Sequence, residues 1–127
     1  MACTVLSVED DDELQEIYAA MLKETDCQIT PAYDGEEAWD RLQETTPDLI
    51  LLDLILDEMM GDQLFAKIKQ SPRHRDIPIV VVTVLSAEGC RQLLEVDPRT
   101  LFLRKPFQKA QLLEVVQRGL ARAYVKE

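Results

Sequence analysis

The segment Asp48-Leu49-Ile50-Leu51-Leu52-Asp53 places four consecutive aliphatic residues between two aspartates. A run without alternating polar residues predicts a strand that is covered on both faces, as in a parallel sheet flanked by helices. Ile79-Val80-Val81-Val82 has the same character. We therefore expect these two runs to form the central strands of a parallel sheet.

Short apolar runs recur along the chain and alternate with longer segments of helical period. This alternation predicts βα units, and their right-handed crossovers lead to a doubly wound sheet with helices on both faces. The expected fold class is α/β: a (βα)5 three-layer sandwich with a five-stranded parallel sheet in the flavodoxin-like order 2-1-3-4-5. A single domain over residues 1–127 is expected. The predicted strands are 4–8, 28–32, 49–52, 77–82 and 100–103.

The helical segments carry their own start and stop signals. Asp12 followed by Gln15 resembles a capping box, and an apolar stripe follows in the same helix. This stripe consists of Leu14, Ile17, Tyr18, Met21 and Leu22. The other predicted helices are 36–44, a helix that Gly61 precedes and Ser71-Pro72 ends, 87–95 with a weak apolar face, and 108–124.

The charge balance restricts the partners. The 127 residues include 14 Lys and Arg against 24 Asp and Glu, which gives a formal net charge of −10. Because an acidic surface repels phosphate backbones and anionic lipids, we expect no direct binding to nucleic acid or to membranes. No apolar run approaches the ~20 residues that a membrane span needs, so neither a span nor a signal peptide is predicted.

The cysteines and the histidine give no sign of a metal or disulfide site. Cys3, Cys27 and Cys90 are widely spaced, odd in number and form no C-x-x-C pair. This pattern favours neither a disulfide framework nor a zinc site, and it points to a reducing cytoplasm. His74 lies in a polar segment and is expected to be a solvated loop residue.

Polar residues follow the predicted strands. Glu9 and Asp10 follow the first strand, Asp53 the third, Thr83 the fourth and Lys105 the fifth. The carboxyl ends of parallel strands share one edge, so these side chains should converge. Carboxylates held close together cannot all stay ionised without a counter-charge, which implies a divalent cation. Oxygen ligands favour Mg²⁺, with Mn²⁺ as a substitute.

The same set of side chains suits a phosphoryl group. A Lys ammonium, a Thr hydroxyl and the metal could each bind one phosphoryl oxygen. An Asp between them could then accept the group covalently as an acyl phosphate. Phosphoryl transfer depends mainly on positioning and charge neutralisation, so no separate general base is required.

Four motifs, in this order and spacing, resemble the receiver domains of response regulators in two-component signalling. They are Val8-Glu9-Asp10, the 48–53 segment followed by Gly61, Val81-Val82-Thr83, and Lys105-Pro106-Phe107. The match covers essentially the whole chain. The resemblance implies that the domain is a phosphoacceptor of a phosphorelay rather than an enzyme, promoting only its own phosphorylation and dephosphorylation. Its implied phosphoryl donor is a histidine kinase or a histidine phosphotransfer protein.

The resemblance also implies a role for each site residue. Asp53 would accept the phosphoryl group, and Lys105 and Thr83 would hold it. The implied metal ligands are Glu9, Asp10, Asp53 and the backbone carbonyl of Ile55. The Lys105-Pro106 peptide bond would be cis.

A conformational switch is implied as well. Phe102 occupies the position of the family's switch aromatic, three residues before Lys105. Thr83 would move toward the phosphoryl group and Phe102 would fill the vacated space, which would reshape the surface of the fourth helix, fifth strand and fifth helix. The expected recipient is a downstream protein or a covalently attached output domain, and the domain would be a monomer or a phosphorylation-linked dimer.

Some residues depart from the family's usual pattern. Asp57 stands where a proline is usual, and Val84 stands where a small residue is usual. Ile55 and Leu85 occupy positions that commonly tune hydrolysis of the acyl phosphate, and both are too apolar to position water, so we expect a long-lived phosphoryl group. Asp57 and Val84 support one alternative, a receiver-like interaction module that works without phosphorylation.

Two other functions with a similar site are less consistent with the sequence. A flavodoxin-like cofactor binder needs a Ser/Thr/Gly-rich loop after the first strand, where this chain is acidic. A phosphatase of the haloacid-dehalogenase type needs a second Asp two residues after the nucleophile, where this chain has Ile55.

Overall fold

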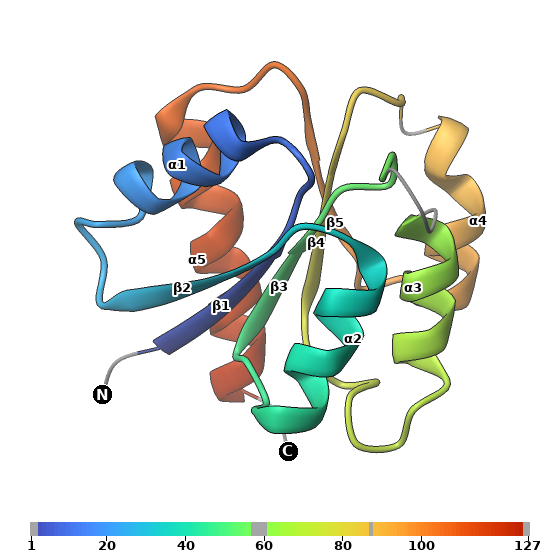
Figure 1. Ribbon diagram of the computed structural model, residues 1–127. Helices are drawn as coiled ribbons and strands as arrows, with labels where there is room; N and C mark the ends of the chain where they lie inside the picture. Colours follow the sequence, from blue (N-terminus) through green and yellow to red (C-terminus); the bar gives the residue numbers. More distant parts are fainter. Residues whose placement is uncertain (1–2, 57–60, 87, 126–127) are drawn as a thin grey trace.

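The computed structural model describes residues 3–56, 61–86 and 88–125 and contains one parallel sheet with helices on both faces (Figure 1). Its five strands lie in the order β2-β1-β3-β4-β5. The predicted doubly wound fold and strand order are therefore confirmed. The strands are β1 (Cys3–Val8), β2 (Cys27–Ala32), β3 (Leu49–Leu52), β4 (Ile79–Thr83) and β5 (Leu101–Arg104).

Two groups of helices cover the sheet (Figure 1). One face carries α1 (Asp12–Met21) and α5 (Lys109–Val125). The other carries α2 (Gly35–Glu44), α3 (Gly61–Lys69) and α4 (Arg91–Val96), with the short 3-10 turn η1 (Glu88–Cys90) before α4. The expected helix over 87–95 is thus a turn and a short helix, and residue 87 lies outside the described residues. Within the described part of the chain, no helix is long and apolar enough to cross a bilayer.

The residues of β3 explain why both faces need helices. Leu49 and Leu51 belong to the apolar cluster under α1 and α5, whereas Ile50 and Leu52 belong to the cluster under α2, α3 and α4. All four side chains are buried. Because these side chains alternate between the two clusters, this short strand links the two halves of the core. Each fully buried aliphatic side chain contributes about 1.5 to 3 kcal/mol to the stability of the fold.

The start of α1 differs from the sequence prediction. Asp11 is the N-cap, and its carboxylate accepts a hydrogen bond from the Glu13 amide at 2.9 Å. Gln15 does not turn back to cap the helix, because its side chain points into the interior and is buried. The predicted capping box of Asp12 and Gln15 is therefore wrong.

His74 is buried rather than solvated, so that prediction is also wrong. Its Nε2 lies 2.9 Å from the Leu42 carbonyl oxygen, and its Nδ1 lies 2.8 Å from the Ser71 hydroxyl. The ring packs edge-on against Trp39. Because both ring nitrogens have partners, the imidazole can be buried beneath the α3–β4 connection without an unsatisfied polar group.

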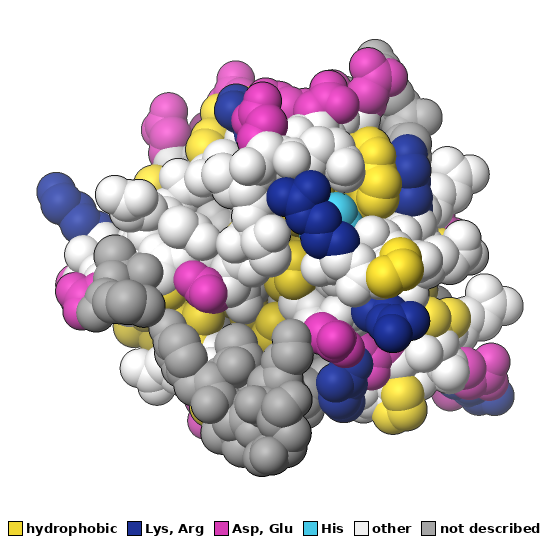
Figure 2. Space-filling model, turned by 90° about the horizontal axis from the view of Figure 1, so that it is seen from below, with side chains coloured by type: hydrophobic (Ala, Val, Ile, Leu, Met, Phe, Trp, Pro, Cys, Tyr) yellow, Lys and Arg dark blue, Asp and Glu magenta, His cyan; other side chains and the backbone are white. Residues whose placement is uncertain are grey.

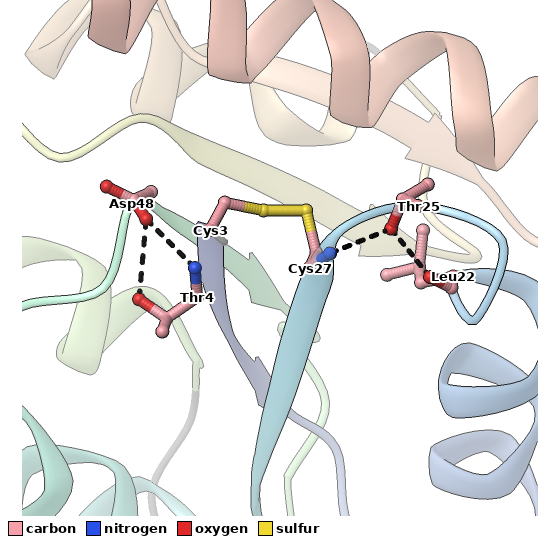
Figure 3. Close-up of a disulfide and its surroundings, with 6 residues drawn as sticks. All are labelled: Cys3, Thr4, Leu22, Thr25, Cys27 and Asp48. Carbon is pink, nitrogen blue, oxygen red and sulfur yellow. Dashed lines mark hydrogen bonds between the residues drawn. A yellow bond between two sulfur atoms is a disulfide. The ribbon is translucent and has the colours of Figure 1, made fainter. Parts of the chain in front are cut away.

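Cys3 and Cys27 form a disulfide (Figure 3), contrary to the expectation from their spacing. The parallel β1–β2 ladder places these residues opposite each other, with their Cα atoms 4.4 Å apart. Sequence separation cannot reveal this adjacency, because it arises from the register of the two strands. The bond lies where β1 and β2 begin. Figure 2 views this lower side of the molecule, where Lys and Arg are scattered among Asp and Glu.

Reduction of the Cys3–Cys27 bond is expected to lower the free energy of unfolding by about 3 kcal/mol, because the crosslink closes a loop in the unfolded chain. Urea unfolding with and without a phosphine reductant measures this difference. Cys90→Ser is the control and should keep the full effect, since Cys90 is a free, buried thiol. Coincident unfolding curves of the wild type under both conditions would contradict the prediction.

Candidate functional site

The central strands deliver two acidic residues side by side. In the β1–β3 ladder Val8 lies opposite Leu52, and Glu9 and Asp53 follow directly after the two strands. The Asp53 amide donates to the Val8 carbonyl at 3.1 Å, and the Glu9 amide donates to the Ala32 carbonyl at 3.0 Å. Backbone hydrogen bonding between neighbouring strands therefore continues one residue beyond the ends of β1 and β3, and it holds the backbone of Glu9 and of Asp53 in place.

Three carboxylates meet at this edge. Glu9, Asp10 and Asp53 each place a carboxylate oxygen within 4.8 Å of the others. Glu9 and Asp53 are buried, and Asp10 is partly exposed. The structure thus brings together the acidic residues that the sequence predicted as metal ligands.

Lys105 is the cation of the site. Its Nζ donates to Glu9 Oε1 and to Asp53 Oδ2, both at 3.0 Å. Burial of the ammonium opposes its charge, but its bonds to Asp53 and Glu9 outweigh this effect and raise the pKa of Lys105. The Lys105 amide also donates to the Thr83 carbonyl at 2.9 Å, and the Lys105-Pro106 peptide is cis, as expected.

The remaining negative charge suits a hard divalent cation. Burial and the nearby Asp53 charge raise the pKa of Glu9 to about 7, even though Lys105 donates to it. Among the described residues, the site has one ammonium group and three carboxylates, so its net charge is negative. All the side-chain atoms of this group that could bind a metal there are oxygens. This donor set fits Mg²⁺ and Mn²⁺ better than the softer metals that prefer nitrogen or sulfur.

The neighbouring loops supply the rest of the predicted site. Asp53 Oδ1 accepts the Ile55 amide at 3.1 Å, so both oxygens of this carboxylate have partners. Thr83 is buried at the end of β4, and its hydroxyl oxygen accepts the Leu85 amide at 3.2 Å. The side chains of Ile55 and Leu85 are 49% and 41% exposed, so the edge of the site carries apolar groups open to solvent. Asp57 lies outside the described residues.

Gly61 allows α3 to begin directly against the backbone of Asp53. A Cβ atom at this position would lie 2.2 Å from the Asp53 carbonyl oxygen, a distance that no side chain could tolerate. The Gly61 amide donates to the Leu54 carbonyl at 2.9 Å. The glycine therefore lets the helix support the backbone just after Asp53.

Sequence reasoning missed one residue of the site's support. Gln15 contacts the Glu9 carbonyl with its side-chain amide at 3.0 Å. The available signal was periodicity, because Gln15 lies in helical phase with the buried Tyr18 and Leu22, whereas the predicted stripe residue Ile17 is exposed.

Comparison with known proteins identifies a family. The family profile described as response regulator receiver domain matches residues 5–117. Response regulator Rre1 of Synechocystis sp. is 30% identical over 120 residues, which cover 94% of this chain and 52% of that protein. The chain spans about half the length of several curated relatives that it matches.

Solved structures of receiver domains are similar to this chain as well. The receiver domain of a signal transduction histidine kinase from Syntrophus aciditrophicus is 33% identical with a TM-score of 0.88, covering 99% of this chain and 96% of that one. The receiver domain of sensor histidine kinase PA1611 from Pseudomonas aeruginosa PAO1 is 28% identical with a TM-score of 0.84, covering 95% and 99%. The latter structure has a magnesium ion coordinated in its active-site cleft.

Glu9→Gln is expected to stabilise the metal-free protein at pH 8 by about 2 to 3 kcal/mol. The folded protein keeps a proton on Glu9 up to a pKa of about 7, whereas the unfolded chain loses it near the ordinary glutamate pKa of 4.5. Wild-type stability should therefore fall as the pH rises through this window, while the glutamine variant lacks this loss.

Urea unfolding in EDTA between pH 4 and pH 8 tests this prediction. The exposed Glu13→Gln is the control, and its difference from the wild type should stay small over the whole range. A Glu9→Gln advantage that does not grow with pH would show that the Glu9 charge is not opposed in the folded state.

Proposed function

The chain belongs to the family of response regulator receiver domains, and we propose that its Asp53 accepts a phosphoryl group from a histidine kinase or a histidine phosphotransfer protein. The observation that carries this proposal is the bridge from Lys105 to both Glu9 and Asp53 at 3.0 Å, within a group of three carboxylates. This arrangement provides a nucleophile, a cation and oxygen ligands at one edge of the sheet. The domain would promote only its own phosphorylation and dephosphorylation.

Asp53 would act as the nucleophile. The Ile55 amide and Lys105 hold its two oxygens, so the carboxylate has a defined orientation. One carboxylate oxygen would bond to phosphorus as the bond from phosphorus to the donor's imidazole nitrogen breaks. The electron pair leaves with the imidazole, and the product is an acyl phosphate. A carboxylate carries no proton to remove, so the step needs no general base.

Other residues would prepare this reaction. Glu9, Asp10, Asp53 and the backbone carbonyl of Ile55 would hold Mg²⁺, or Mn²⁺ as a substitute. When bound, the ion would neutralise charge on the phosphoryl oxygens. Lys105 would exchange a carboxylate partner for a phosphoryl oxygen, and the Thr83 hydroxyl would donate to another.

Phosphorylation would be read out through the switch residues. Phe102 is half-buried against the apolar cluster of the α2–α3–α4 face and lies opposite Val81 in the β4–β5 ladder. We propose that Thr83 moves toward the phosphoryl group and that Phe102 fills the space it leaves. The altered α4–β5–α5 surface would act on a downstream protein or an attached output domain, in a monomer or a phosphorylation-linked dimer. The phosphoryl group can shift this equilibrium only through its different affinity for the two states.

A receiver with these partners would work in the cytoplasm. Reducing conditions there would favour the thiols of Cys3 and Cys27. The two cysteines lie at the start of β1 and β2, whereas Asp53 follows the end of β3. The proposed chemistry therefore does not depend on the disulfide.

Asp53→Asn is expected to abolish phosphorylation, because an amide cannot form the acyl phosphate. Intact mass is measured before and after acetyl phosphate with Mg²⁺, and the wild type should gain one phosphoryl group. Asp40→Asn, an exposed substitution on α2, is the control and should gain it as well. A wild type that stays unmodified would favour an interaction module that works without phosphorylation, and a modified Asp53→Asn would place the acceptor elsewhere.

The acyl phosphate is expected to be long-lived, because neither Ile55 nor Leu85 can position an attacking water. Ile55→Asn should speed hydrolysis about 10-fold by supplying a polar group that can orient water. Val96→Asn replaces another exposed apolar residue, at the end of α4, and should leave the rate unchanged. The rate is followed by intact mass after removal of the phosphodonor. Hydrolysis of the wild type within seconds in Mg²⁺ buffer would contradict the prediction.

A further inference from the structure

A buried amide lies behind the acidic site. Gln15 of α1 and Ser7 of β1 are 4% and 0% exposed, and together we call them the Gln15–Ser7 pair. The Ser7 hydroxyl donates to Gln15 Oε1 at 2.5 Å. Gln15 Nε2 lies within hydrogen-bonding distance of three backbone carbonyl oxygens, those of Ser7 and Glu9 at 3.0 Å and that of Ala32 at 3.1 Å, and its two N–H groups are shared among them.

The hydrogen-bonding chemistry permits only one orientation of this amide. Carbonyl oxygens can only accept, so the NH₂ group of Gln15 must face the three carbonyls. Its oxygen then needs a donor, and the Ser7 hydroxyl is that donor. A flipped amide would leave buried polar atoms unsatisfied, at a cost of about 1 to 3 kcal/mol each. The Gln15–Ser7 pair is therefore a rigid element.

The Glu9 carbonyl is the contact that connects this element to the site. Glu9 is the first residue after β1, where regular strand pairing ends. Its amide is held by the Ala32 carbonyl and its carbonyl is held by Gln15. With both ends of the residue fixed, the peptide between Glu9 and Asp10 has a set plane, and the Cα atoms on either side of this peptide carry the two carboxylate side chains.

We infer that Gln15 is a positioning residue for the Glu9 and Asp10 carboxylates, acting through the Glu9 backbone. The inference rests on the proposed function, because orientation of these carboxylates matters for a metal that they would bind. Packing alone does not require an amide here, since an apolar side chain of similar length would fill the same space between α1 and β1. The bond to the Glu9 carbonyl is the feature that such a side chain would lose.

Gln15→Met tests the inference, because methionine matches glutamine in length and cannot hold the carbonyls. Leu22→Ala is the matched control. Leu22 is fully buried where α1 ends, and it belongs to the apolar cluster under α1 and α5, so its truncation destabilises the protein without removing the bond to the Glu9 carbonyl. Calorimetric titration with Mg²⁺ gives metal affinity, and urea unfolding gives stability.

Gln15→Met is expected to bind Mg²⁺ about 10-fold more weakly, as is usual when a group that orients a metal ligand is lost. Leu22→Ala should keep wild-type affinity despite lower stability. Equal affinity in Gln15→Met and wild type, or equal losses in Gln15→Met and Leu22→Ala, would overturn the inference. Ser7→Ala removes only the hydroxyl bond and should weaken binding in the same direction by less, which gives a second test if Gln15→Met does not fold.

A metal-free measurement separates this inference from the proposed function. Hydrogen exchange at the Glu9 and Asp11 amides reports the local backbone, since these amides donate to the Ala32 carbonyl and to the Glu9 carboxylate. Both should exchange faster in Gln15→Met than in Leu22→Ala, relative to the global stability of each variant. A wild type that takes up no Mg²⁺ would refute the proposed function, while unchanged exchange at these amides would refute the role of Gln15.

Discussion

Mutual repulsion among Glu9, Asp10 and Asp53 is the constraint around which the site is organised. Burial of Glu9 and Asp53 strengthens this repulsion, because water no longer screens their charges well. Lys105 compensates part of it through two bonds of 3.0 Å, yet burial and the nearby Asp53 charge keep the pKa of Glu9 raised, at about 7. The residual negative charge makes the corner receptive to a divalent cation, and a cation held there would in turn attract a phosphoryl group. The charge imbalance is thus the property that a receiver would use.

Backbone geometry holds these like charges together, in addition to the two bonds from Lys105. The β1–β3 ladder places the two buried acids next to each other whatever their charge. Gly61 lets α3 approach the Asp53 carbonyl, and Gln15 holds the Glu9 carbonyl from the other side of the sheet. Since the core beneath is apolar on both faces of β3, the energy that opposes the repulsion comes from packing outside the site. This separation explains how a folded domain can keep an electrostatically unfavourable corner.

The sequence carried those features that depend on the order of residues along one element. The unbroken aliphatic run of β3 indicated a strand that is covered by helices on both faces. The residues that follow each strand indicated the convergence of Glu9, Asp53 and Lys105. Features that depend on a particular contact between two elements, rather than on the edge that all parallel strands share, could not be predicted from the sequence. The disulfide depends on strand register, the burial of His74 depends on a carbonyl from α2, and the role of Gln15 depends on carbonyls in β1, just after β1 and in β2. The polar character of His74 and Gln15 led to wrong predictions for both residues. Both side chains are buried, because partners in the interior satisfy their hydrogen bonds.

The two ends of α4 make different contacts, and this bears on the proposed switch at Thr83. At the far end, the buried Asp97 carboxylate accepts Lys69 Nζ at 2.6 Å. Burial opposes its charge, but bonds from Arg99 and Lys69 outweigh burial and lower the pKa of Asp97 to about 2. At the near end, Cys90 caps the helix without a side-chain hydrogen bond. Along the chain, a rearrangement that started at Thr83 would therefore reach the end of α4 without a side-chain cap before the end held by the Asp97 ion pair. Because a buried ion pair is costly to break, the far end would act as the fixed point of such a movement.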